Sequence, residues 1–92
     1  MPDIDHWRER IDNVDAQMLS LLNQRARYVL EIGKIKLALS LPVYMPERER
    51  WIYDNVERIN QGPLSNAAVR RLFERIIDES RRLEKEANEG EQ

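Results

Sequence analysis

The sequence predicts an all-α fold with three helices per chain, one long and two shorter, interlocked with a second copy into an intertwined homodimeric bundle. Apolar residues recur at alternating spacings of three and four along the first half of the chain, which is the pattern of a helix that packs along partner helices. Only 3 glycines and 4 prolines leave few turns for an all-β fold. With 92 residues the chain forms at most one small domain, and such short chains often rely on a partner.

The longest apolar pattern predicts a helix over about 5–40. Such a helix would be roughly 50 Å long at about 1.5 Å per residue. Pro42 ends it, because the residue before a proline is disfavoured in the α region. The apolar residues that define this pattern, called the seam below, are Ile4, Trp7, Ile11, Val14, Met18, Leu21, Tyr28, Ile32, Ile35 and Leu39.

Two shorter helices are expected over about 46–61 and 65–87. Pro46 suits the first helical position of the second helix, and Gly62-Pro63 stops it. Ser65 is the expected N-cap of the third helix, and the polar tail after that helix is expected to fray. Both helices are too short to cover the long one completely, so part of the seam needs a second chain.

Composition argues against several classes of protein. A net charge of −2 disfavours a nucleic-acid partner. The absence of cysteine and the single histidine, His6, argue against a metal site, and no cofactor is expected. The polar N-terminus and the lack of a long apolar run disfavour a signal peptide and a membrane partner, so the expected location is cytoplasmic.

Charged residues interrupt the inward faces of the predicted helices. Arg25 stands at a seam position where the spacing calls for an apolar residue, and a buried arginine is costly unless its charge is paired. Arg8 and Lys36 flank the same seam. An arginine that extends to solvent, a buried salt bridge or a solvated rim would each explain one of these residues without a function.

The two shorter helices carry inward polar residues as well. Arg48 and Glu49 lie on the inner side of the first turn of the second helix. Ser80 and Glu84 are one turn apart on the inward line of the third helix. For Glu84 the alternative is a position in the frayed end, with the carboxylate facing water.

Considered together, the charges favour a pocket for a small dianion over a salt-bridge network, since cations are in excess on the inner faces. Arg25 and Lys36 are roughly 16 Å apart along the helix, so both side chains can approach one small ligand. Arg8 is roughly 42 Å from Lys36 and can join that site only from the second chain of an antiparallel pair. The counted residues are Arg8, Arg25, Lys36 and Arg48 against Glu49 and Glu84.

The order and spacing of these residues resemble the AroQ-class chorismate mutases, from Arg8 to about Glu84. The resemblance implies one chorismate mutase domain over 1–92 and an intertwined dimer with two shared active sites. It also implies rearrangement of the small-molecule substrate chorismate to prephenate, in phenylalanine and tyrosine biosynthesis. The motifs that carry it are Arg8-x-x-Ile11-x-x-Val14-Asp15, Leu21-Leu22-x-x-Arg25, Gly33-x-x-Lys36, Pro42-Val43, Arg48-Glu49 and "RLFERIIDES" over 71–80.

Roles for individual residues follow from the same resemblance. Arg25 would bind one substrate carboxylate, and Arg8 of the partner subunit would bind the other. Lys36 would donate to the ether oxygen of the breaking bond, while Glu49 would accept from the ring hydroxyl. The remaining wall of the pocket is assigned to Arg48 and Ser80.

Two positions depart from the best-known bacterial pattern. Glu84 stands where many members have glutamine, whose amide donates to the ether oxygen. An ionised Glu84 would repel that oxygen and a protonated one would donate to it, so we expect activity to favour acidic pH. Met45 stands where an aspartate often precedes the second helix, and its loss as an N-cap costs about 1 kcal/mol. A backbone N–H contact from Met45 to the substrate would survive this change.

Two alternatives stay open at this point. An isochorismate-pyruvate lyase has the same fold and a similar pocket, although the mutase residue set is complete here. A non-catalytic dimeric helical module would explain the seam but not Arg25, Lys36 and Glu49 facing inward together. Whether a pathway enzyme binds the chain is not determined by the sequence.

Overall fold

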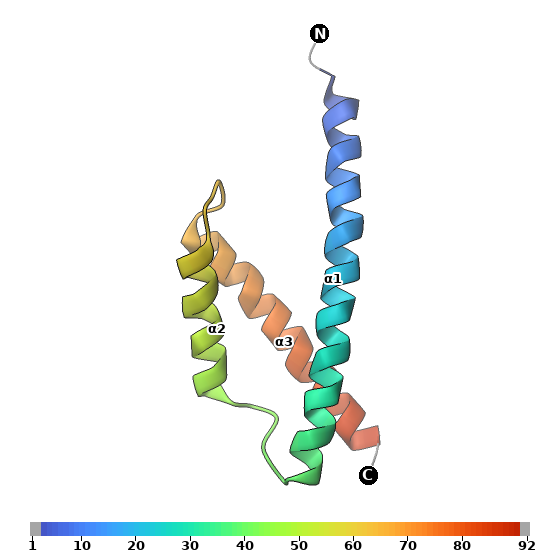
Figure 1. The fold of residues 1–92 in the computed structure, drawn as a ribbon, viewed down its shortest axis with the longest axis vertical. Helices are drawn as coiled ribbons and strands as arrows, with labels where there is room; N and C mark the ends of the chain where they lie inside the picture. The colour runs from blue at the N-terminus through green and yellow to red at the C-terminus, as the bar shows by residue number, and fades with distance from the viewer. Residues whose placement is uncertain (1–2, 91–92) are drawn as a thin grey trace.

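The computed structural model describes residues 3–90 and folds them into three helices, α1 (Ile4–Ala38), α2 (Pro46–Ile59) and α3 (Asn66–Gly90) (Figure 1). No strand occurs within this range, which confirms the all-α prediction. The third helix extends to Gly90, past the expected end near residue 87. The polar residues up to Gly90 are therefore helical rather than frayed.

Helix starts in this chain are set by side-chain caps at two of three positions. The carboxylate of Asp3 accepts a hydrogen bond from the Asp5 amide at 3.0 Å and begins α1. Ser65 Oγ accepts from the Ala68 amide at 3.1 Å, which confirms its expected role as the cap of α3. At the start of α2, the side chain of Met45 makes no capping hydrogen bond. Pro46 occupies the first turn, and its nitrogen carries no hydrogen that would require a partner.

The end of α1 is closed by backbone hydrogen bonds before Pro42 is reached. The Leu41 amide donates to the Lys36 carbonyl at 2.8 Å, and the Ser40 amide donates to the Leu37 carbonyl at 3.2 Å. Ser40 has a φ of +57°, so it takes the left-handed conformation common after a helix end. This turn reverses the chain and directs residues 41–45 back toward α3.

The third helix holds the chain together by packing against both of the others, whereas α1 and α2 do not pack on each other in the part of the chain that the structure describes. The molecule is elongated, with extents of 60 × 26 × 14 Å. The N-terminal part of α1 projects beyond the rest of the chain (Figure 1). None of the helices in residues 3–90 has an apolar stretch long enough to cross a membrane.

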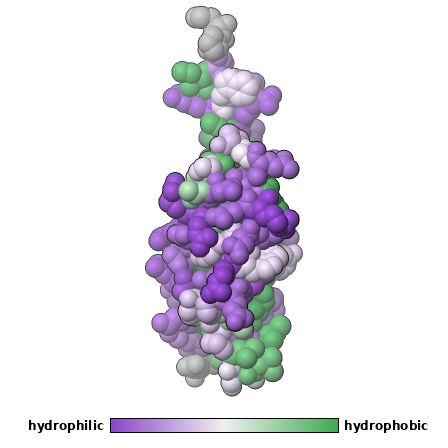
Figure 2. Space-filling view, turned by 90° about the vertical axis from the view of Figure 1, so that its left-hand side faces the viewer, coloured by the Kyte–Doolittle hydropathy of each residue, from purple (hydrophilic) through white to green (hydrophobic). Residues whose placement is uncertain are grey.

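The core of the single chain is small, because the buried apolar side chains are Val56, Val69 and Ile77. Every seam residue is instead 50–64% exposed. The expectation that α2 and α3 cover part of the seam is therefore wrong: α3 packs against a different face of α1, the one on which Gly33 is buried. Figure 2 shows apolar residues at the surface in the projecting part and again at the opposite end of the molecule.

Candidate active site

A cleft of about 550 Å³ lies where the C-terminal half of α1, the 39–45 segment, the start of α2 and the C-terminal half of α3 meet. Apolar side chains such as Val29, Ile52 and Ile77 form part of its wall. The cleft brings together seven of the eight residues predicted for the site: Arg25, Lys36, Met45, Arg48, Glu49, Ser80 and Glu84.

The eighth predicted residue, Arg8, lies outside the cleft on the projecting part of α1. Its guanidinium is 3.6 Å from the carboxylate of Asp5, and both side chains are exposed. An exposed pair of this kind adds little to stability. Within one chain, Arg8 is therefore separate from the other predicted residues.

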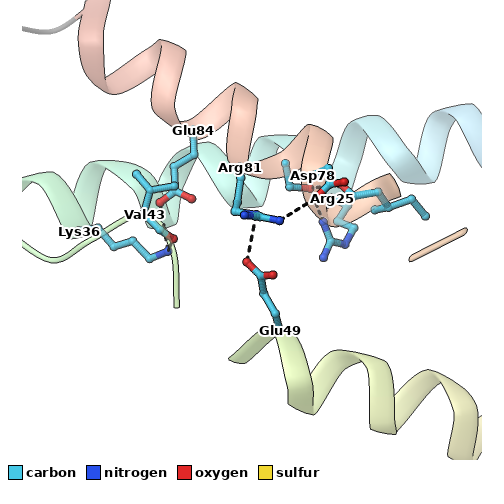
Figure 3. Close-up of polar contacts among 9 residues, drawn as sticks. Arg25, Lys36, Val43, Glu49, Asp78, Arg81 and Glu84 are labelled. Atoms are coloured by element: carbon cyan, nitrogen blue, oxygen red, sulfur yellow. Dashed lines mark hydrogen bonds and ion pairs between the residues drawn. The ribbon is translucent and has the colours of Figure 1, made fainter. Parts of the chain in front are cut away.

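Lys36 and Glu84 form a buried ion pair at one end of the cleft (Figure 3). The Lys36 Nζ is 3.2 Å from Glu84 Oε1 and donates a hydrogen bond to the Val43 carbonyl at 3.0 Å. Glu84 is only 5% exposed, so the alternative of a carboxylate facing water is wrong. Its position depends on Gly33, since a Cβ at that residue would lie 2.8 Å from Glu84 Cγ.

Arg25 is half-buried and is held by Ser80. Its NH1 donates to Ser80 Oγ at 2.6 Å, and the Ser80 hydroxyl in turn donates to the Ile76 carbonyl at 2.8 Å. Burial lowers the pKa of Arg25, and the nearby charge of Arg48 lowers it further. Ser80 takes one of the five N–H donors of the guanidinium, so the others are available to a ligand.

Glu49 and Arg81 form a second ion pair across the cleft, between α2 and α3 (Figure 3). Arg81 Nε is 3.2 Å from Glu49 Oε2, and Arg81 NH2 is 2.6 Å from Asp78 Oδ1. Arg81 is not among the residues predicted from the sequence. A signal was present, because Arg81 follows the buried Ile77 by four residues and so lies on the same helical face.

The two ion pairs leave an excess of positive charge in the cleft. Arg25 and Arg48 have no carboxylate partner within residues 3–90. Arg48 instead lies over the Trp51 ring, with its guanidinium carbon 4.7 Å from the ring centroid. Two cations without a carboxylate partner at a partly apolar cleft can bind a small dianion.

Metal binding has no support in the described part of the chain. Residues 3–90 contain no group of three or more His, Cys, Asp or Glu side chains placed to hold a metal ion.

Fold and site define a small all-helical protein with a cation-rich cleft between its helices. The profile of the family described as chorismate mutase type II matches residues 7–85. The chain belongs to this chorismate mutase type II family.

Relatives and solved structures agree with this membership. The bifunctional chorismate mutase/prephenate dehydratase of Aquifex aeolicus is 36% identical over 89 residues, which are 92% of this chain and 25% of that protein. The chain thus spans a quarter of the length of this bifunctional relative. The chorismate mutase of Methanocaldococcus jannaschii is 28% identical over 81 residues, covering 86% of this chain and 81% of that one.

Two solved structures share the fold over almost the whole chain. Chorismate mutase (Form II) from Thermus thermophilus superposes with a TM-score of 0.88 at 36% identity, covering 89% of this chain and 93% of that chain. Chorismate mutase from Helicobacter pylori in complex with prephenate superposes with a TM-score of 0.85 at 25% identity, covering 91% of each chain.

Proposed function

We propose that this chain, as a single domain over 1–92, catalyses the rearrangement of chorismate to prephenate. The observation that carries the proposal is the cleft itself, in a chain of the chorismate mutase type II family. Half-buried Arg25 lines this cleft together with Lys36 and Glu49, and it has no carboxylate partner within residues 3–90. A half-buried arginine without a carboxylate partner lowers the stability of the fold. A non-catalytic helical module that binds no ligand would gain nothing from such a residue. A cytoplasmic location stays a prediction.

The chemistry of this reaction suits the groups in the cleft. The rearrangement is unimolecular and pericyclic, so it requires no nucleophile and no general base. Cations that hold both substrate carboxylates favour the compact conformer in which the reacting atoms meet. A donor at the ether oxygen stabilises charge that grows as the bond breaks, so it lowers the energy of the transition state more than that of the substrate.

Each role is assigned on the position of the side chain. Arg25 binds one carboxylate, and Lys36 donates to the ether oxygen. Glu49 accepts a hydrogen bond from the ring hydroxyl through the oxygen that Arg81 does not engage. The wall is completed by Arg48, Ser80 and the backbone of Met45.

The second carboxylate requires a second copy of the chain. The seam runs the length of α1 and is at least half exposed at every residue, so an antiparallel copy would bury it. Pairing about the centre of the seam places residue 8 of one chain opposite about residue 35 of the other, one residue from Lys36. Arg8 of the partner subunit thereby reaches the cleft, and the homodimer contains two shared sites.

Glu84 is the second residue of the proposed site that acts on the ether oxygen, beside Lys36. Its buried Oε1 lies 3.2 Å from Lys36 Nζ, yet within residues 3–90 it has no well-directed hydrogen bond. An ionised Glu84 repels the ether oxygen beside Lys36, and a protonated one donates to it. Glu84→Gln, whose amide donates at every pH, should therefore raise turnover.

Chorismate consumption by the purified chain at about pH 5 and about pH 8, with the product identified, tests this function. We expect prephenate as the product. Arg25→Gln should abolish turnover, whereas Arg27→Gln, which removes an exposed charge from the same helix, should not. Pyruvate release from isochorismate without prephenate formation from chorismate would establish the lyase instead, and no turnover of either substrate would contradict an enzyme. Turnover that Glu84→Gln leaves unchanged or lowers would refute the role of Glu84.

A further inference from the structure

We propose that Arg81 is a positioning residue that holds Glu49 as the acceptor for the substrate hydroxyl. The inference rests on the proposed function and adds a residue that the sequence analysis did not include. Arg81 lines the cleft at the start of the last third of α3, and its guanidinium is directed across the cleft at Glu49 (Figure 3).

Three segments of the chain converge on this one guanidinium. Glu49 contributes from α2 at 3.2 Å, and Asp78 contributes from α3 at 2.6 Å. The ring of Tyr44, in the segment before α2, lies 5.1 Å from the guanidinium carbon. Since α1 and α2 do not pack on each other in residues 3–90, Arg81 fixes the start of α2 against α3 at the wall of the cleft.

Arg81 contacts two carboxylates through different nitrogens, and each contact has its own effect. Asp78 is half exposed and takes the terminal NH2, which fixes the side-chain rotamer. That rotamer brings the buried Nε within 3.2 Å of Glu49 Oε2, as an ion pair that has no well-directed hydrogen bond within residues 3–90. Only one oxygen of Glu49 is engaged in this way, so the other keeps its lone pairs for a hydroxyl donor.

Charge gives a second reason for an arginine at this position. The side chain of Glu49 is only 14% exposed and lines a cleft that has to admit a dianion. Like charges in such a site repel strongly, and a cation in contact with Glu49 offsets the repulsion. Arg48, the other arginine at this wall, stacks on Trp51. Arg81 is therefore the cation that offsets the charge of Glu49.

The contact also indicates that Arg81 acts through Glu49 rather than on the substrate. One terminal nitrogen donates a hydrogen bond to Asp78, and Nε lies in ionic contact with Glu49. Arg25 and Arg48, by comparison, have no carboxylate partner within residues 3–90 and remain for the substrate.

A double-mutant cycle with Glu49 tests the proposal, with kcat and KM measured on chorismate. Arg81→Gln should lower kcat/KM about tenfold, mainly through KM, because the hydroxyl contact is made in substrate and transition state alike. In a Glu49→Gln background the same change should cost less than about twofold. Arg81→Lys keeps the charge and should recover part of the loss. Arg82→Gln, an exposed neighbour on the same helix, should leave both constants unchanged.

The outcomes separate this inference from the proposed function. An equal loss in both backgrounds would mean that Arg81 merely supports the fold, which overturns the proposal. An unmutated chain with no turnover would overturn the proposed function instead. The contact has its own readout, the ¹⁵N resonance of Arg81 Nε, which Glu49→Gln should shift and Glu79→Gln should not. A resonance that Glu49→Gln leaves in place would show that the pair is absent, and the proposal would fail.

Discussion

Gly33 decides how Glu84 reaches the cleft, because a Cβ at this residue would lie 2.8 Å from Glu84 Cγ. We expect Gly33→Ala to displace the Glu84 side chain and weaken its pair with Lys36. Overpacking costs about 1–3 kcal/mol and the gain in helix propensity returns about 1, so stability should fall by about 1 kcal/mol. Urea unfolding and turnover measure the two effects.

Gly90 provides the matched control, since no atom of the described residues 3–90 lies within 4 Å of a Cβ built there. Gly90→Ala should leave turnover unchanged and should not destabilise the chain. Full activity in Gly33→Ala would show that the position of Glu84 does not matter for the reaction.

Arg25 is the residue at which function and stability are expected to oppose each other. Its pKa is lowered by burial and by Arg48, so its charge is disfavoured in the folded chain. A cation with a lowered folded pKa destabilises the fold at every pH below that pKa, and the penalty is relieved only as the pH rises through it. At neutral pH the penalty is fully present.

Arg25→Leu should therefore remove the penalty and leave the free energy of unfolding unchanged or higher by about 1 kcal/mol. The same change should lower kcat/KM by about 100-fold or more, since a carboxylate of the substrate loses its partner. Chemical denaturation and steady-state kinetics on one preparation check both. A variant that loses stability together with activity would indicate that Arg25 is structural.

At the scale of elements, the turn after α1 determines where residues 41–45 enter the site. Ser40 holds a φ of +57° there, a conformation that glycine adopts without strain. Ser40→Gly should raise the free energy of unfolding by about 0.5–1 kcal/mol and leave the cleft intact. Thermal unfolding at one fixed protein concentration measures it, because the stability of the proposed homodimer would depend on concentration. A drop in stability would contradict a left-handed Ser40.

The helices themselves were predictable because their signals are local. Pro46 and Ser65 mark two starts, and the apolar spacing marks the inward faces. The errors lie where local signals end. The Schellman-type bonds that close α1 at Lys36 and Leu37 act before Pro42, and nothing in the polar tail shows that α3 continues to Gly90.

At the scale of the whole molecule, the sequence predicted seven residues of the cleft and left out Arg81. Residues such as Arg25 stood out because they break an apolar line. Arg81 also breaks such a line, four residues after the buried Ile77, but it lies between Ser80 and Arg82 in a stretch of α3 rich in charge. Only the packing of α2 shows that Glu49 faces it. The face of α1 that meets α3 was likewise hidden, because Gly33 carries no hydrophobic signal.

The exposed seam and the isolated position of Arg8 make the shared site testable by complementation. Arg8→Gln and Arg25→Gln should each be nearly inactive alone, because every site of either homodimer lacks one of the two arginines that bind the substrate carboxylates. In a heterodimer, Arg25 of the first variant meets Arg8 of the second, so one of the two sites is complete. Unfolding and refolding an equal mixture should form heterodimers in about half of the dimers and restore about a quarter of the unmutated activity. Recovery should be absent when the two variants are mixed without unfolding, if the chains exchange slowly. No recovery after refolding would place Arg8 outside the site, and strong activity of Arg8→Gln alone would show that one chain is sufficient.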